Sequence, residues 1–241
     1  MRQDGLKTVC KPKFVHNTDS RQSLPIAENI LARQFNLARP NTAFASDLTY
    51  IRSCTGWLYL AIVLDLYSRK ILGWAMAPGM PAELVCAALR MAIEQRRPAA
   101  GLIVHSDRGS QYASLQHQTL LAQHGFICSM RRRQNCWALE HCSNAVAKCF
   151  FMTPKMKCVW QHTYASQAEA KIDVVSCIVG FYNSERLNSV LGNLSSAFVD
   201  GKWQQINLSL CPIILDQHKS QFSLVFTGFH WFAPIKCRSI W

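Results

Sequence analysis

Two aspartates lie where a carboxylate is costly to bury. Asp47 lies inside the apolar run FASDLTYI at 44–51, and Asp107 ends the apolar run GLIVHSD at 101–107. A buried carboxylate has to be paired, hydrogen-bonded or bound to a metal ion. Two carboxylates at adjacent strand ends can hold Mg²⁺ through oxygen ligands, and two such ions can support phosphodiester cleavage. The plain alternative for Asp47 is a satisfied carboxylate of the core or the sheet edge.

Three β-rich runs precede Asp107 and would position the first carboxylate. They occupy residues 44–52, 57–66 and 70–76, and the separators CTG and YSR are short enough for hairpins. These features predict an antiparallel meander of three strands. Apolar residues at helical spacing then predict a helix of about 15 residues between Pro81 and Arg97.

The following segments alternate between strand and helix patterns. Residues 101–107 and 126–130 read as strands, and residues 115–125 read as a helix closed by a glycine. This alternation predicts a parallel extension of the sheet. Further helices are expected from Ser143, a good N-cap, and from Ser166, where SQAE resembles a capping box. The fold class is therefore α/β: a mixed sheet flanked by helices, with a strand order that the sequence does not determine.

The two ends of the chain differ from the middle. Residues 1–40 are polar and basic, which predicts a leader without a core of its own, and residues 41–200 contain all the periodic segments. Residues 201–241 are apolar without helical or alternating period. They predict an irregular tail with an exposed apolar surface that would promote association.

The composition favours a polyanionic partner. The net charge is +12, and nucleic acid is the commonest polyanion, with an anionic membrane surface as the rival. The longest apolar run, at 57–64, is far shorter than the roughly 20 residues of a membrane-spanning helix. The N-terminus lacks the pattern of a secretory signal, so we expect a cytoplasmic protein without a membrane span. The eleven cysteines form no CxxC pair, which argues against a disulfide framework and a zinc ribbon.

A basic cluster follows the fifth predicted strand. Arg131, Arg132 and Arg133 are consecutive, and Lys155 and Lys157 follow in the next predicted helix. Such charges contact phosphates and confer an affinity that depends on salt and little on base sequence. We therefore predict that these residues bind DNA. A solvated face is the alternative.

Five segments together resemble a known family. They are PNTAFASDLTYI, GWLYLAIVLDLYSRKILGWAM, IVHSDRGSQY, NAVAKCFF and FYNSERLNSVLGNLS, in this order. Over about residues 1–200 the chain resembles bacterial insertion-sequence transposases of the retroviral-integrase type, the product of their second reading frame. The resemblance implies an RNase H-like core with a five-stranded mixed sheet. It also implies that residues 1–20 are the end of an upstream helix-turn-helix module.

The resemblance implies a particular chemistry and a defect in it. The family uses an Asp-Asp-Glu triad with two divalent ions, Mg²⁺ or Mn²⁺, to cut element ends and join them to target DNA. Its first two acids fall on Asp47 and Asp107, and its third falls on Lys148. An ammonium at that place would pair with the carboxylates and compete with the metal ions. The alternative is an ordinary helix lysine that faces solvent.

Other departures occur close to Lys148. About five residues, ALEHC at 138–142, are inserted before the helix, and Pro154 removes a backbone hydrogen bond from its third turn. We therefore expect a transposase-like DNA-binding protein that has lost DNA cleavage and strand transfer. A second copy of the chain or an intact transposase is the expected protein partner. The alternatives are a noncatalytic protein that modulates an intact transposase, and a remnant that folds poorly.

Overall fold

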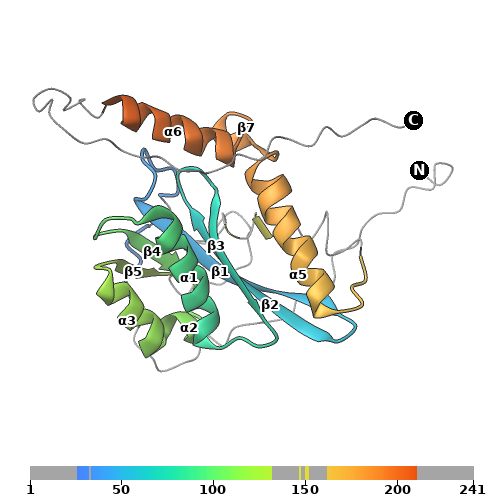
Figure 1. The fold of residues 1–241 in the computed structure, drawn as a ribbon. Coiled ribbons are helices and arrows are strands. Elements are labelled where there is room, and N and C mark those ends of the chain that lie inside the picture. The colour runs from blue at the N-terminus through green and yellow to red at the C-terminus, as the bar shows by residue number, and fades with distance from the viewer. Residues whose placement is uncertain (1–25, 33, 132–146, 148–149, 152–161, 211–241) are drawn as a thin grey trace, which may run out of the picture.

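A mixed sheet in the strand order β3-β2-β1-β4-β5 lies at the centre of the protein in a computed structural model (Figure 1). The structure describes residues 26–32, 34–131, 147, 150–151 and 162–210. The five strands are β1 (Ala43–Ser53), β2 (Gly56–Asp65), β3 (Ile71–Ala77), β4 (Ile103–Ser106) and β5 (Ile127–Met130).

The pairing of the strands confirms the predicted meander and its parallel extension. Strand β2 pairs antiparallel with both β1 and β3, whereas β4 pairs parallel with both β1 and β5. In the parallel ladder, Ala45 of β1 lies opposite His105 of β4. Strand β1 is therefore the central strand, and it joins the antiparallel half of the sheet to the parallel half.

Helices cover both faces of this sheet, with α1, α2 and α3 on one side and α5 on the other (Figure 1). Helix α1 has the expected length of 15 residues, and Pro81 is its N-cap rather than its first residue. Helix α2 was not predicted. The helices and short strands are α1 (Ala82–Arg96), α2 (Ser110–Ala113), α3 (Leu115–Gln123), α5 (Gln167–Ser176), the π-helix η3 (Cys177–Asn183), β6 (Leu187–Asn188), the 3₁₀ helix η4 (Ser189–Leu191), β7 (Leu194–Ser195) and α6 (Ser196–Leu210).

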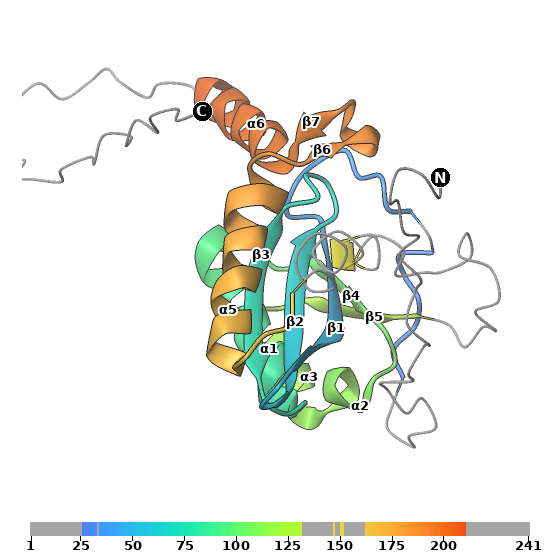
Figure 2. The same ribbon diagram turned by 90° about the vertical axis from the view of Figure 1, so that its right-hand side faces the viewer.

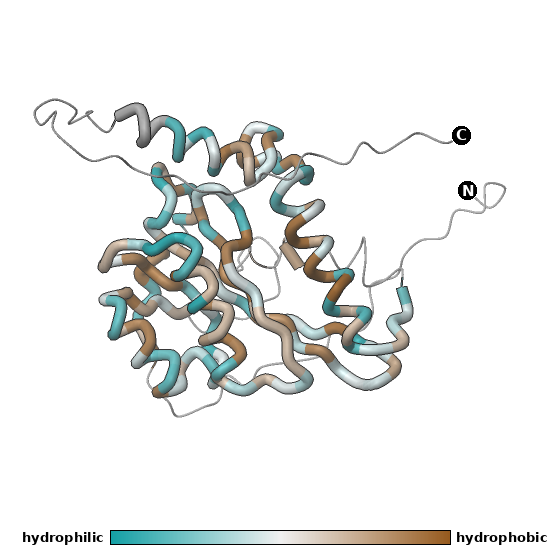
Figure 3. Tube along the Cα trace, in the orientation of Figure 1, coloured by the Kyte–Doolittle hydropathy of each residue, from teal (hydrophilic) through white to brown (hydrophobic). Residues whose placement is uncertain are grey.

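The core has two layers because successive residues of a strand point to opposite faces of the sheet. Phe44 and Leu48 of β1 pack in the layer under α1 and α3. Ala43 and Ala45 pack in the other layer, under α5. Hydrophobic stretches accordingly run along the strands and alternate with hydrophilic ones on the helices (Figure 3).

Helix α5 begins at the predicted capping box. The Ser166 hydroxyl accepts a hydrogen bond from the Glu169 backbone N–H at 3.2 Å, and a Glu169 carboxylate oxygen accepts one from the Ala165 N–H at 2.8 Å. The helix continues into η3, whose last residue, Asn183, forms two hydrogen bonds with the backbone of Ile71 in β3. The FYNSER motif thus covers the outer edge of the sheet.

The segment that precedes β1 packs on the core. Leu31 is buried in the layer under α5, where Phe35 and Leu37 also pack. The Ser129 hydroxyl of β5 accepts a hydrogen bond from the Ile30 N–H at 3.1 Å. Residues 1–25, which hold most of the predicted leader, lie outside the described residues.

Helix α6 includes the first ten residues of the segment for which the sequence predicts an irregular tail. It continues to Leu210, so residues 201–210 are helical, and together with the β6–β7 hairpin it lies at one end of the sheet (Figure 2). Lys70 and Arg96 both form ion pairs with Asp200, and these contacts hold α6 against the core. Residues 211–241 lie outside the described residues.

Two predictions from composition can be compared with the described part of the chain. In that part, no helix combines the length and apolarity needed to cross a membrane. Cys54, Cys86, Cys128 and Cys177 are free thiols there. The remaining cysteines lie outside the described residues.

Candidate active site

The pairing of β1 with β4 determines where the two aspartates lie. Ala45 lies opposite His105, and each aspartate follows two residues later in its own strand direction. Asp107 comes directly after the last residue of β4, while Asp47 lies in the part of β1 that continues past it. Both aspartates therefore follow the same end of the β1–β4 ladder.

Both carboxylates are held by backbone hydrogen bonds. An Asp47 carboxylate oxygen accepts a hydrogen bond from the Leu48 N–H at 2.9 Å, and Asp47 is only 7% exposed. Asp107 is half-buried, and its carboxylate accepts a hydrogen bond from the Gly109 N–H at 2.9 Å. The second contact closes the turn that leads into α2, so each carboxylate has a defined orientation.

Tyr112 of α2 contacts the strand that carries Asp47. Its hydroxyl is buried and lies 3.0 Å from the hydroxyl of Ser46, the residue before Asp47. Burial raises the pKa of Tyr112 well above its usual value, and the negative charges of Asp47 and Asp107 raise it further. Both carboxylates therefore act on the same hydroxyl group, and Tyr112 is a neutral hydrogen-bond donor beside them.

The segment around the third acid position is described only in part. Lys148 itself lies outside the described residues. Its neighbours Ala147 and Phe150 are buried in the same core layer as Ala45. Because Asp47 is two residues after Ala45, it lies on that same face of β1. Among the described residues, no group of three His, Cys, Asp or Glu side chains could hold a metal ion.

Two arginines flank Asp107. Arg131 follows β5, and its backbone N–H donates a hydrogen bond to the Ser106 carbonyl at 3.1 Å. The Arg108 side chain donates a hydrogen bond to the Arg131 carbonyl at 2.6 Å. Arg131 is thus bonded to the residue before Asp107, and Arg108 adds a charge that the predicted DNA-binding cluster did not include. The other predicted DNA-binding residues, Arg132, Arg133, Lys155 and Lys157, lie outside the described residues.

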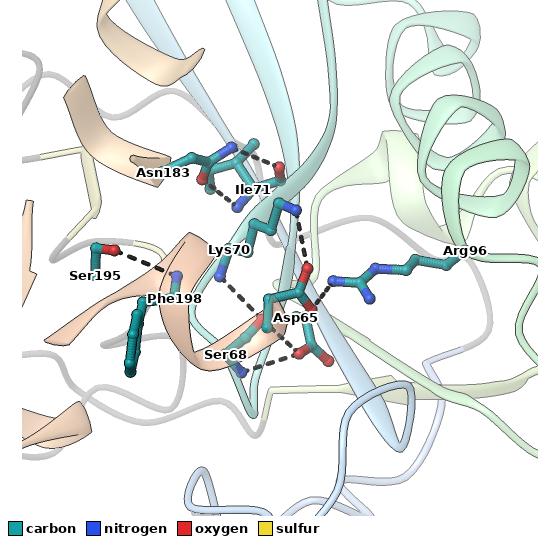
Figure 4. Close-up of polar contacts among 9 residues, drawn as sticks. Asp65, Ser68, Lys70, Ile71, Arg96, Asn183, Ser195 and Phe198 are labelled. Atoms are coloured by element: carbon teal, nitrogen blue, oxygen red, sulfur yellow. Dashed lines mark hydrogen bonds and ion pairs between the residues drawn. The ribbon is translucent and has the colours of Figure 1, made fainter. Parts of the chain in front are cut away.

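A third aspartate on this sheet has a structural role. Asp65 is fully buried at the end of β2, where its carboxylate accepts hydrogen bonds from the N–H and hydroxyl of Ser68 (Figure 4). It also accepts one from the Asn41 N–H. Burial raises the pKa of Asp65, and these hydrogen bonds oppose the increase. Its hydrogen bonds go to the turn between β2 and β3, so it shapes that turn.

Sequence analysis did not identify Ser46 and Tyr112 as parts of the site. Ser46 is a polar residue inside an apolar run, and Tyr112 lies in the motif IVHSDRGSQY, five residues after Asp107. Both signals are present in the sequence, but neither indicates that the two hydroxyl groups meet. That contact requires α2 to fold back over β1.

Comparisons with known proteins agree with the fold. Residues 38–136 match the family model described as integrase core domain. A chain of the simian T-cell lymphotropic virus intasome, solved in complex with PP2A regulatory subunit B56 gamma, superposes with a TM-score of 0.54 at 13% identity. The alignment covers 86% of this chain and 67% of that chain. The molecule therefore has the RNase H-like fold of integrase cores.

Sequence relatives define the family more narrowly. Transposase InsF for insertion sequence IS3A from Escherichia coli (strain K12) is 37% identical over 202 residues, which is 84% of this chain and 68% of the relative. The insertion element IS600 uncharacterized 31 kDa protein from Shigella sonnei is 39% identical over 201 residues, which is 83% of this chain and 72% of the relative. The chain belongs to the insertion-sequence transposases.

Proposed function

We propose that this chain is a transposase-type DNA-binding protein whose core has kept two catalytic acids, Asp47 and Asp107, and has lost cleavage and strand transfer. The observation that carries the proposal is that Asp47 and Asp107 both follow the last pair of the β1–β4 ladder by two residues, in a chain with Lys148 where the resemblance places the third acid. A DNA-cleaving site of this kind needs three acids, so a lysine in place of the third acid changes the metal site directly.

Asp47 and Asp107 are suited to hold a divalent ion. Carboxylate oxygens are the ligands that Mg²⁺ and Mn²⁺ prefer. Hydrogen bonds from backbone N–H groups orient the carboxylates of Asp47 and Asp107. When bound, two such ions would activate water and stabilise the leaving oxygen of a phosphodiester. A lysine in place of the third acid removes one negative ligand and adds a positive charge. At a separation of about 4 Å and an effective dielectric constant of about 20, the Coulomb interaction energy of two unit charges is about 4 kcal/mol.

The charges around Asp107 support DNA as the partner. Arg108 and Arg131 contact each other beside the carboxylate, and the chain carries a net charge of +12. We include Arg132, Arg133, Lys155 and Lys157 in the same surface on the strength of the sequence. Such residues bind phosphates and release counterions, so the affinity for DNA should fall linearly with the logarithm of the salt concentration.

Nuclease and strand-transfer assays test the loss of activity. The purified chain is incubated with a nicked or hairpin DNA in Mg²⁺ or Mn²⁺, and we expect no metal-dependent cleavage. Lys148→Glu should restore cleavage, and adding Asp107→Asn to that variant should abolish it again. Cleavage by the unaltered chain that disappears in Asp107→Asn would show that the site is active and would overturn the proposal.

Exposed apolar side chains favour a second candidate function. Leu187, Val190 and Phe198 are all more than half exposed, and they lie on the β6–η4–α6 segment at one end of the sheet. Contiguous exposed apolar groups mark protein contacts. The chain would then pair with an intact transposase and modulate it. Co-purification with such a relative, weakened by Phe198→Ser, tests this role, and a monomer that ignores the relative contradicts it.

A further inference from the structure

The β1–β2 hairpin extends beyond the parallel half of the sheet. Strand β1 has 11 residues, but its described ladder with β4 ends at Ala45. The following residues, 46–53, pair with β2, and β2 also pairs with β3 as far as Tyr59, which lies opposite Tyr50. Residues 51–58 therefore form a two-stranded arm at the end of the hairpin.

An aromatic and basic cluster lies near the tip of this arm. The Tyr50 and Trp57 rings meet edge to face, with centroids 5.1 Å apart and an interplanar angle of 79°. Arg52 lies opposite Trp57 in the register, and its guanidinium carbon is 6.0 Å from the Trp57 ring centroid. Trp57 is nevertheless 44% exposed, and Arg52 is exposed as well. A large aromatic surface therefore faces solvent beside a fixed positive charge.

The tip is anchored to the start of α5. The Cys54 N–H donates a hydrogen bond to the Tyr164 carbonyl at 2.9 Å. The Gln167 side chain donates one to the Trp57 carbonyl at 3.0 Å, and the Gln167 N–H donates one to the Thr55 hydroxyl at 3.2 Å. Because these bonds fix the backbone on which Trp57 stands, a ligand would not have to order it on binding.

We propose that Tyr50, Arg52 and Trp57 form a stacking site for a base of single-stranded DNA at the end of the β1–β2 hairpin. The exposed Trp57 ring would stack on the base, and Arg52 would contact the adjoining phosphate. Charge complementarity supports a nucleic acid here, since residues 48–61 contain Arg52 and no acidic residue. The inference rests on the proposed DNA-binding function and adds a site to it.

The stacking cluster and Asp47 lie on opposite faces of the sheet. Arg52 follows Asp47 by five residues, and successive residues of a strand point to opposite faces. Tyr59, which lies opposite Tyr50, packs in the core layer under α1, whereas Asp47 shares its face of β1 with Ala45. The stacked base would thus lie on the face of the sheet that carries α1.

Binding of a labelled single-stranded oligonucleotide, followed by fluorescence anisotropy with the full chain, tests the site. A stacked base contributes at least about 1 kcal/mol, so Trp57→Ala should weaken binding about fivefold or more. Trp57→Phe, which keeps an aromatic ring, should retain most of the affinity. Leu115→Ala is the matched control, because it also removes an exposed apolar side chain (83% exposed) and should change nothing. Arg52→Gln should reduce the slope of affinity against salt by about one unit.

Oligonucleotides with a single abasic position separate stacking from other effects. The unaltered chain should lose affinity at one position, and Trp57→Ala should show no further loss there. If Trp57→Ala binds DNA as tightly as the unaltered chain, the stacking site is wrong and the proposed function stands. If the unaltered chain binds no DNA, the proposed function itself fails. A change in sedimentation of Trp57→Ala without a change in DNA affinity would assign the cluster to a protein contact and overturn the inference.

Discussion

The Tyr112 hydroxyl donates a hydrogen bond to the Ser46 hydroxyl, which lies 3.0 Å away. The direction follows from the second bond of Ser46, whose single hydroxyl proton is donated to the Ile62 carbonyl at 2.9 Å. This chain of two bonds runs from α2 through β1 to β2. It ties the helix that follows Asp107 to the strand that carries Asp47.

Removal of the Tyr112 hydroxyl and removal of the Ser46 hydroxyl should lower the free energy of unfolding by different amounts. Tyr112→Phe keeps the ring and leaves Ser46 bonded to Ile62, so we expect a loss of about 1 kcal/mol in the free energy of unfolding. Ser46→Ala leaves the Tyr112 hydroxyl buried without this acceptor, and we expect about 1 to 3 kcal/mol. Urea denaturation measures both variants. A Tyr112→Phe variant that is clearly less stable than Ser46→Ala would contradict the assigned direction of the bond.

His117 should make the protein sensitive to mild acid. Burial lowers the pKa of His117 from 6.5 to about 4, and its hydrogen bond to the Tyr112 carbonyl opposes the shift only in part. The folded protein then binds fewer protons than the unfolded chain between these values, so the stability is complete above pH 6.5 and is lost as the pH falls toward 4. From these two values, the loss from pH 7 to pH 5 is about 2 kcal/mol.

The variant His117→Leu isolates this contribution. The Tyr112 carbonyl keeps its hydrogen bond from the Gln118 side chain at 2.8 Å, so the backbone stays satisfied. Urea unfolding at pH 7 and pH 5 should show a smaller pH dependence for His117→Leu than for the unaltered chain. The exposed His124 provides the control, since His124→Gln should leave the difference unchanged. Equal pH dependence in all three proteins would refute the assignment.

Asp200 should be needed to dock α6. Its side chain is 3% exposed and forms ion pairs with Lys70 at 2.9 Å and with Arg96 (Figure 4). Asp200→Ala leaves the Arg96 guanidinium buried without this partner, which typically costs 3 to 5 kcal/mol, and we expect about 3 kcal/mol. Hydrogen exchange should increase first in α6.

The exposed ion pair of Glu83 with Arg90 is the matched control for Asp200. Both of its side chains are largely in solvent, so Glu83→Gln should cost about 1 kcal/mol or less. Similar losses in Asp200→Ala and Glu83→Gln would mean that burial of the Asp200 pairs contributes nothing.

Gly73 should be irreplaceable because β3 touches α1 there. A Cβ atom at this position would lie 2.0 Å from the Ala88 carbonyl oxygen, a backbone atom that cannot move aside without shifting the helix. Gly73→Ala should therefore cost about 3 kcal/mol or more in the free energy of unfolding. Gly180→Ala is the matched control, since a Cβ there meets nothing within 4 Å. Thermal unfolding compares the two variants, and a Gly73→Ala protein as stable as Gly180→Ala would disprove the close approach.

The sequence predicts most of the fold because its signals are local. The hairpin separators identify the meander, the spacing of apolar residues identifies α1, and Ser166 with Glu169 identifies the start of α5. Helix α2 is missed because its four residues are too few to show a period. Helix α6 is missed because it is held by Asp200 reaching Lys70 and Arg96, and such contacts leave no periodic pattern.

By itself, the sequence determined the family, and it predicts Asp47, Asp107 and Lys148 at the three acid positions of that family. These follow from residue types in a recognisable order. Only the tertiary structure decided that the Tyr112 hydroxyl meets the Ser46 hydroxyl, that Asn183 covers the edge of β3, and that Trp57 is exposed beside Arg52. The reason is physical: each relation depends on strand register and helix packing between distant parts of the chain, and no local pattern encodes either.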